Sequence, residues 1–310
     1  ANGIQGMEYV TDTFMYLNDQ PASLLWYHDH TMGSTRFKPY LGLAAAYPFI
    51  YTLSISLSSP ADASRNSLHL WPAGFNVEAY RRIFQTPEIM RGYINSIIRT
   101  VLGTFITVLA TCLAAYPLSR KQMPHRGLFL FMIVFTMLFN GGMVPAYLLV
   151  KQLGMINTVW ALVIPSALSA FNIIIVKNFF QQIPESLHEA ARIDGASELT
   201  ILCRIYLPLS LPVLATLSLW TAVSHWNQWF DAMLYITDDR KQVLQLFLQR
   251  IVIENSTDMI NKGLPGDVAH YSLQTLQAAA VVITILPMLA LYPLAQRYFI
   301  KGITLGGIKE

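Results

Sequence analysis

The chain has 310 residues, of which only 13% are charged and 54% hydrophobic, and its mean hydropathy is +0.41. Soluble domains carry about 25% charged residues, so this chain has too little charge to cover a globule of its size. The net charge of +3 argues against a nucleic-acid-binding surface, and two cysteines, Cys112 and Cys203, exclude a disulfide framework or a four-cysteine metal site. A membrane protein with several spans is the class that remains.

The first 44 residues differ in character from the rest. His28-Asp29-His30 places two imidazoles on one face of a strand, where both can reach copper, although an isolated pair of this kind usually has no function. With its surroundings, WYHDHTMGSTR, the stretch resembles the second copper-binding motif of multicopper oxidases over about residues 18–44. The other five histidines are isolated, so the resemblance implies His28 and His30 only as remnant ligands, with no metal site. We expect an irregular foreign segment at residues 1–44 and a membrane domain at residues 45–310.

Six stretches lack Asp, Glu, Lys and Arg, and each is close to or above the roughly 20 residues that a helix needs to cross a bilayer. They are Pro39–Ala61, Thr100–Ser119, Gly127–Val150, Gln152–Val176, Ile205–Phe230 and Val268–Gln296. Polar ends reduce the first and last to about Tyr40–Leu57 and Leu276–Tyr298. Prolines lie inside several stretches, but membrane helices tolerate them because neighbouring helices satisfy the freed carbonyls. The sequence predicts an all-α membrane protein with a six-helix transmembrane bundle.

Basic residues near short loops predict the orientation. The turn after the second stretch carries Arg120, Lys121 and Arg126, whereas the turn after the third carries only Lys151. Because basic residues concentrate in cytosolic loops, we expect the first of these turns, and both termini, in the cytosol. Ser58–Arg99 is then an outer loop, and its five arginines run against the rule.

A polar segment, Lys177–Arg204, separates the fourth and fifth stretches. Pro184 suits the first position of a short helix, small residues share one of its faces, and Gly195 supplies its end. Ser197 can cap a second helix that continues into the fifth span. An amphipathic connector on the membrane surface and a docking helix for another protein both fit this pattern.

The spacing within this segment favours the docking helix. It reads EAA, three residues, G, nine residues, I, one residue, LP, and so resembles the EAA loop of ABC-transporter permeases. The matching residues, together with two shared with the sugar-uptake branch, are Glu189, Ala190, Ala191, Asp194, Gly195, Ala196, Ile205, Leu207 and Pro208. LAAYPLSRK from Leu113 and WNQWFDAMLYI from Trp226 likewise resemble maltose-type carbohydrate permeases, over about residues 46–310. The resemblance implies a cytosolic coupling helix that contacts an ATPase.

The same resemblance implies the partners. A permease of this kind pairs with a second permease subunit, an ABC ATPase dimer and an extracytoplasmic sugar-binding protein, in the lipid bilayer of the bacterial cytoplasmic membrane, and not with nucleic acid. The chain has no G-x-x-x-x-G-K-[ST] loop for a nucleotide phosphate. We therefore expect no cofactor and no enzymatic activity in this chain, and ATP hydrolysis in a partner.

Four residues at the end of the fifth stretch are candidates for the sugar path. Aromatic faces stack on sugar rings and amides bond to sugar hydroxyls, which selects Trp226, Asn227, Trp229 and Asp231. For the two tryptophans, anchoring in the membrane interface is an equally good explanation.

Two other functions remain open from the sequence. A membrane-anchored multicopper oxidase-like protein would use the His28-Asp29-His30 motif. An ion-coupled transporter acting alone would need ionisable groups within the spans, where His225 is the one strong candidate. The permease subunit of an ABC sugar importer is the function that the sequence favours.

Overall fold

The computed structural model describes residues 46–65, 70–253 and 272–306. The chain divides into two compact units, residues 1–50 and 51–310. Of the first unit only residues 46–50 are described, and they are helical. The copper-type motif with His28 and His30 lies outside the described residues. The second unit contains the elements that follow.

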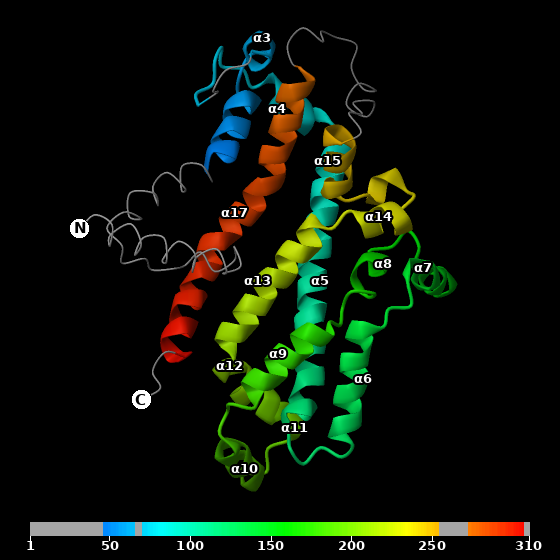
Figure 1. The fold of residues 1–310 in the computed structure, drawn as a ribbon, viewed down its shortest axis with the longest axis vertical. Helices are drawn as coiled ribbons and strands as arrows, with labels where there is room; N and C mark the ends of the chain where they lie inside the picture. Colours follow the sequence, from blue (N-terminus) through cyan, green and yellow to red (C-terminus); the bar gives the residue numbers. More distant parts are fainter. Residues whose placement is uncertain (1–45, 66–69, 254–271, 307–310) are drawn as a thin grey trace, which may run out of the picture. The chain divides into compact units, whose positions relative to one another are not determined.

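All regular elements in the described ranges are helices, which confirms the predicted all-α class (Figure 1). A helix over residues 46–56 precedes the others. They are α3 (Pro60–Ala63), α4 (Glu78–Gln85), α5 (Pro87–Ser119), α6 (Arg126–Leu138), α7 (Met143–Gln152), α8 (Trp160–Val163), α9 (Ala170–Phe180), α10 (Glu185–Ile193), α11 (Glu198–Ile201), the π-helix η2 (Leu202–Tyr206), α12 (Leu207–Leu209), α13 (Leu211–Asn227), α14 (Phe230–Tyr235), the 3₁₀-helix η3 (Asp239–Lys241), α15 (Leu244–Val252) and α17 (Leu273–Gly306).

Helix α5 is longer than the charge-free stretch that predicted it. It has 33 residues and extends about 50 Å, compared with about 30 Å for the hydrocarbon core of a bilayer. The helix begins at Pro87, so the last part of the expected outer loop Ser58–Arg99 is helical and continuous with the predicted span. Pro87 occupies the first turn, where its missing N–H costs nothing, and Glu88 lies near the positive helix end. Charge counting placed the boundary at Arg99, which the helix in fact contains.

The third predicted span is broken. Helices α6 and α7 meet at an angle of 113°, so Gly127–Val150 is not one straight helix. Gly142, immediately before α7, has φ +87°, a backbone conformation that glycine adopts without steric cost. The bend lies at this residue and its neighbours.

The fourth predicted span, Gln152–Val176, is broken as well. It holds the end of α7, the single turn α8 and most of α9. Pro165 follows α8, and Ser169 caps α9 by accepting a hydrogen bond from the backbone N–H of Asn172. Because Pro lacks the N–H that continues a helix, α8 ends where it does.

The fifth stretch forms a helix that bends by 83° between α12 and α13. Pro208 and Pro212 lie in the first turns of α12 and α13. The π-helix η2 precedes them, with the N–H of Leu207 bonded to the carbonyl of Leu202. Within the described residues, α5 and Leu273–Leu291 of α17 are each long and apolar enough to cross a membrane, and the two bent pairs add up to two more spans.

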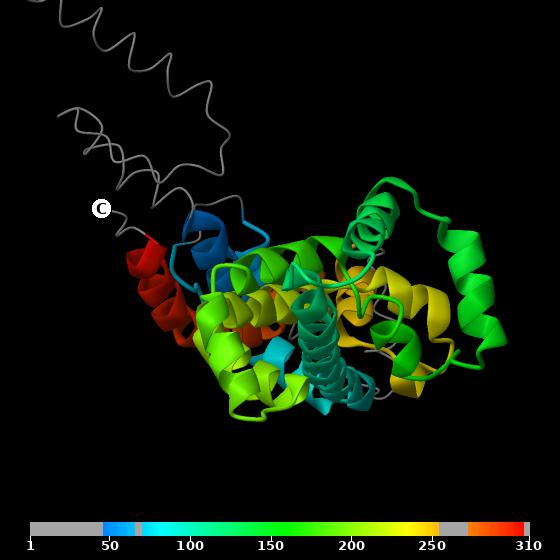
Figure 2. The same cartoon turned by 90° about the horizontal axis from the view of Figure 1, so that it is seen from below.

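Helix α5 is the centre of the packing in the second unit. Its first half contacts α4, α13 and α15, and its second half contacts α9 and η2 (Figures 1 and 2). Two glycines allow this close packing: a Cβ on Gly92 would lie 2.7 Å from the Phe247 ring, and one on Gly103 would lie 2.5 Å from His225 Nε2. Helix α7 stands apart from this group in both views. The two ends of α5 therefore organise different sets of neighbours.

Candidate functional site

Helix α10 forms at one end of α5, as the sequence predicts. Glu185 is in its first turn, and Gly195, with φ +79°, closes it. The N–H of Ala196 bonds to the carbonyl of Ala191 at 2.9 Å, which satisfies one of the free carbonyls at the helix end. Ser197 then caps α11 by accepting from the N–H of Thr200 at 3.3 Å. The predicted helix, turn and cap are confirmed, except that the helix begins at Glu185 and Pro184 directly precedes it.

The residues of the EAA pattern divide into an exposed set and a packed set. The packed set is half-buried against the core that joins α5, α9 and η2: Ala191, Ala196, Ile205 and Leu207. The exposed set comprises Glu189, Ala190, Asp194, Gly195 and Pro208. Ile193, which the pattern does not select, is 86% exposed. An apolar side chain this exposed, on a helix whose other side packs against the core, leaves α10 with a free face.

Hydrogen bonds attach α10 and the following turn to the end of α5. Tyr116 donates to Glu198 Oε2 at 2.5 Å, and Arg120 donates to the Tyr206 hydroxyl at 3.0 Å. Arg120 also lies 3.4 Å from Glu185 Oε1, to which the amide of Gln122 donates at 2.6 Å. The hydrogen bond from Gln122, and then the charge of Arg120, lower the pKa of Glu185. Helix α10 is thus linked to the end of α5 through Arg120 and Gln122, and through α11 and η2, which follow α10 in the chain.

His188 is a residue of this site that the sequence did not single out. Its side chain is buried, and Nε2 lies 3.7 Å from Glu198 Oε1. Burial lowers the pKa of His188, and the charge of Arg120 lowers it further, against the opposing effect of Glu198. The imidazole is therefore neutral near pH 7. Its place one turn after Glu185 is the only signal that the sequence offered.

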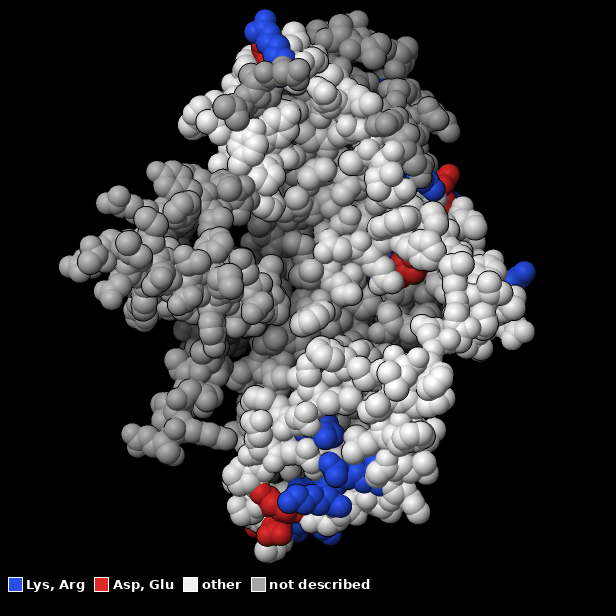
Figure 3. All heavy atoms as spheres, in the orientation of Figure 1, with Lys and Arg blue, Asp and Glu red and all other residues white. Residues whose placement is uncertain are grey.

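A hollow of about 540 Å³ lies beside α10. Its lining includes Tyr116, Arg120, His188, Glu189, Arg192, Glu198 and Leu199. In Figure 3 the basic and acidic side chains gather at this end of the molecule, while much of the visible surface beyond it is uncharged. The α10 end thus combines a free helix face, a hollow and a cluster of charges.

The predicted sugar-path residues lie at the opposite end of α5, and they have different surroundings. Trp226 is buried, donates from Nε1 to the Thr284 carbonyl at 3.0 Å, and meets Tyr93 edge to face with the ring centres 5.7 Å apart. Asn227 is exposed, and Trp229 is half-buried against Phe230. Trp226 is thus a core residue, which neither the stacking nor the interfacial explanation anticipated.

Asp231 forms an ion pair that no sequence motif indicated. Its carboxylate accepts from Arg99, whose side chain is 1% exposed, and Arg99 also donates to the carbonyl of Gln228 at 2.7 Å. Arg99 directly precedes the second charge-free stretch, and Asp231 directly follows the fifth. That flanking placement was a usable signal, because spans running in opposite directions bring these two positions to the same end.

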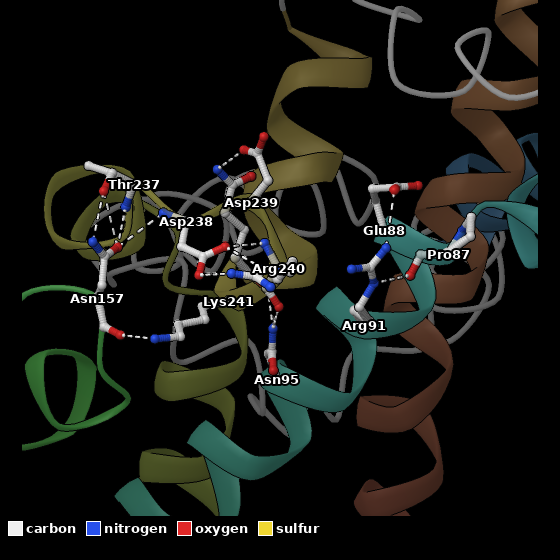
Figure 4. A network of polar contacts seen from close by, with 11 residues as sticks. Pro87, Glu88, Arg91, Asn95, Asn157, Thr237, Asp238, Asp239, Arg240 and Lys241 are labelled. Atoms are coloured by element: carbon white, nitrogen blue, oxygen red, sulfur yellow. Dashed lines mark hydrogen bonds and ion pairs between the residues drawn. The ribbon is translucent and has the colours of Figure 1, made fainter.

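The turn before η3 is fixed by Asn157, which precedes α8 (Figure 4). Its side-chain oxygen accepts from the N–H of Thr237 at 2.7 Å and of Asp238 at 3.0 Å, and its backbone carbonyl accepts from Lys241 at 2.9 Å. Asn157 has φ +60°, which asparagine tolerates better than most residues. Asn95 of α5 binds the other side of this turn, by donating to the carbonyl of Arg240 at 3.0 Å.

Among the described residues, no group of three or more His, Cys, Asp or Glu side chains is placed to hold a metal ion. Cys112 and Cys203 are free thiols, the first buried and the second exposed.

Comparison with known proteins decides the family. Residues 89–305 match the family described as binding-protein-dependent transport system inner membrane component. The chain belongs to this family. It is therefore a membrane component of a transport system.

Three similar proteins narrow the comparison. Protein LplC of Bacillus subtilis is 40% identical, over 90% of this chain and 98% of its own. The polygalacturonan/rhamnogalacturonan transport system permease protein YtcP of the same bacterium is 41% identical, over 86% of this chain and 93% of its own. A chain in the crystal structure of a bacterial ABC transporter that imports the acidic polysaccharide alginate is 34% identical, over 88% of this chain and all of its own, with a TM-score of 0.80. None of these matches supports the resemblance to multicopper oxidases.

Proposed function

We propose that this permease is the membrane-spanning subunit of an ABC importer for oligosaccharides, driven by ATP hydrolysis in a separate subunit. The observation that carries the proposal is the likeness in fold and sequence to a chain of the alginate transporter. The similarity to a polygalacturonan/rhamnogalacturonan permease supports the same substrate class. Both relatives are named for polymers that contain uronic acids, so we propose acidic oligosaccharides as the substrates.

The ATPase binds at α10 in this proposal. Ile193, Glu189 and Ala190 are exposed on that helix, and small side chains allow a partner's backbone to come close. The bonds from Tyr116 of α5 to α11, and from Arg120 directly after α5 to η2, support a route by which movement of the ATPase reaches the membrane helices. A second permease subunit, an ATPase dimer and an extracytoplasmic sugar-binding protein complete the transporter.

The proposed topology has six spans and both termini in the cytosol, in a bacterial inner membrane. Under it the α10 end faces the cytosol, which the basic residues Arg120, Lys121, Arg126 and Arg192 support. The six proposed spans are the predicted Tyr40–Leu57, of which residues 46–57 are described, α5, α6 with α7, α8 with α9, α12 with α13, and α17.

The sugar contacts are assigned to Asn227 and Trp229 in this proposal. Asn227 is exposed at the end of α13, and its side-chain oxygen accepts from Gln245 at 3.4 Å, which leaves its amide N–H groups available. Trp226 and Asp231, which are engaged by Thr284 and Arg99, hold this region in place.

Uptake into proteoliposomes tests the function. The permease is reconstituted with its partner permease, ATPase and binding protein, and uptake of labelled trigalacturonate and maltotriose is measured with ATP inside. We expect ATP-dependent uptake of trigalacturonate, with maltotriose at background. Uptake of maltotriose alone would contradict the proposal that the substrates are acidic oligosaccharides. Uptake of either sugar without the ATPase would contradict the proposal that ATP hydrolysis drives import.

A further inference from the structure

One face of α5 holds the chain that follows α13 by binding its backbone. Arg99 donates to the carbonyl of Gln228 at 2.7 Å, and Asn95 donates to the carbonyl of Gln242 at 2.9 Å. Between them, the Ser96 hydroxyl accepts from the N–H of Leu244 at 2.9 Å. Asn95, Ser96 and Arg99 share a face because residues three and four apart lie side by side on a helix. The two ends of the segment 228–244 are thus bound to α5.

Of these three residues, Arg99 is the one whose burial costs the most free energy, because it is charged. It belongs to a helix long and apolar enough to span a membrane, and its side chain is buried. Removing the two charges of the ion pair from water has a large free-energy cost before their attraction is counted. A buried ion pair is therefore a poor source of stability compared with apolar side chains of the same volume. Ionisable groups within membrane spans generally serve function.

The contacts of Arg99 all lie at one turn, which joins α13 to α14. Gln228, whose carbonyl it binds, lies between Asn227 and Trp229 in the sequence. Asp231, its charge partner, also accepts from the N–H of Ala232 at 2.8 Å, at the start of α14. Arg99 therefore ties together the end of α13, the connecting turn and the first turn of α14, while the protein encloses the guanidinium so that sugar does not reach it.

We propose that Arg99 is a positioning residue for sugar transfer: through Asp231 and the Gln228 carbonyl it fixes the turn that presents Asn227 and Trp229 to the oligosaccharide. This inference rests on the proposed function and adds the residue that orders its sugar contacts. A guanidinium suits this role because its planar fork binds a carboxylate and a carbonyl at the same time, which the ammonium of lysine does with poorer geometry.

The test uses the complete transporter in proteoliposomes and measures trigalacturonate transported per ATP hydrolysed. This ratio does not depend on how much protein is active, so loss of stability alone leaves it unchanged. Arg99→Met with Asp231→Asn removes both charges, so no buried charge is left unpaired, and we expect normal assembly with a ratio lower by about tenfold. Arg99→Lys keeps the charge and is expected to lower the ratio less.

The decisive comparison is between variants with and without a substitution of Asn227 in the turn. If Arg99 acts through Asn227, adding Asn227→Ala to the Arg99→Met and Asp231→Asn variant lowers the ratio no further than either change alone. The matched control removes the exposed pair at the start of α5, Arg91→Met with Glu88→Gln, whose atoms lie 3.2 Å apart. We expect this control to keep the ratio of the unmutated transporter.

Failure of the positioning role can be distinguished from failure of the proposed function. A normal ratio in the double variant, or a further fall when Asn227→Ala is added, overturns the positioning role. If the double variant does not assemble, Arg99→Lys decides, since a normal ratio in that variant overturns the proposal. Absence of uptake in the unmutated transporter instead contradicts the proposed function.

Discussion

Gly195 closes α10 with φ +79°, and no other atom lies within 4 Å of the position that a Cβ would take. A substituent there would be strained by the backbone and would point into open space rather than into the protein. We expect Gly195→Trp to insert in the membrane and to lose copurification with the ATPase, because an indole would occupy the docking face. Pull-down of the ATPase with tagged permease measures this.

The matched control for that variant is Gly154→Trp. Gly154 has φ +68° and equally open surroundings, but it lies between α7 and α8 rather than beside α10. Both variants place a side chain at a positive φ in open surroundings, so the docking site is the intended difference between them. Copurification at normal yield with Gly195→Trp, or its loss with Gly154→Trp, would count against docking at α10.

His188 predicts a pH dependence at the α10 end. Its folded-state pKa lies below the unfolded value of about 6.5, so the unfolded chain binds the proton more readily. The contribution of His188 to stability is complete above about pH 6.5 and is lost as pH falls from there towards the folded pKa. The groups facing the imidazole are Glu198, Glu185, Arg120 and Arg192.

We therefore expect thermal stability, measured in detergent, to fall between pH 6.5 and 5 by more in the unmutated permease than in His188→Gln. Gln retains polar character in the buried position but does not titrate. An equal loss of thermal stability in the two proteins over this pH range would show that other groups cause the acid sensitivity.

At the scale of single residues, sequence motifs predicted features that depend on the local backbone, but not the contacts between separate segments. The EAA spacing selected the helix, Gly195 and the Ser197 cap because these depend on local backbone chemistry. Arg99 and Asn157 were missed because their partners, Asp231 and Thr237, are distant in the chain, and His188 was missed because its partner Glu198 lies beyond the turn at Gly195. No periodicity reports which distant groups meet, although the flanking positions of Arg99 and Asp231 came close to doing so.

At the scale of elements, Gly142 is the test of the bend between α6 and α7. Its φ of +87° disfavours any side chain, so Gly142→Ala is expected to lower the free energy of unfolding by about 1 kcal/mol. Gly141→Ala is the matched control, since Gly141 is equally open but lacks a positive φ. Equal denaturation midpoints for the two variants would show that the bend does not depend on Gly142.

The charge-free stretches predicted where apolar helices lie but not where they bend. The stretch Thr100–Ser119 lies within α5, which continues beyond it because Arg99 has a buried partner and Arg91 pairs with Glu88. In the third and fourth stretches, no charged residue marks the breaks after Leu138 and Val163. Composition is insensitive to direction, and the bends come from positive φ at Gly142 and from Pro165.

At the scale of the molecule, charged and apolar surfaces are separated in the way expected of a membrane protein. The α10 end carries a concentration of basic residues, while the described residues of α6 contain no buried side chain and expose a run of large apolar ones. A helix this apolar and this exposed needs lipid or another apolar surface around it. The charged α10 end then lies outside the hydrocarbon, which makes its side of the membrane measurable.

Cysteine labelling measures that side. Ile193→Cys on α10 and Asp239→Cys on η3, each in a chain with Cys112→Ala and Cys203→Ser, place one exposed thiol at each end. With α10 in the cytosol, a membrane-impermeant maleimide is expected to label the thiol at position 193 only in inside-out vesicles and the thiol at position 239 only in intact cells. Each variant is the control for the other, because a leaky membrane labels both in both preparations. Labelling in the reverse pattern would invert the orientation and would place α10 out of reach of a cytosolic ATPase.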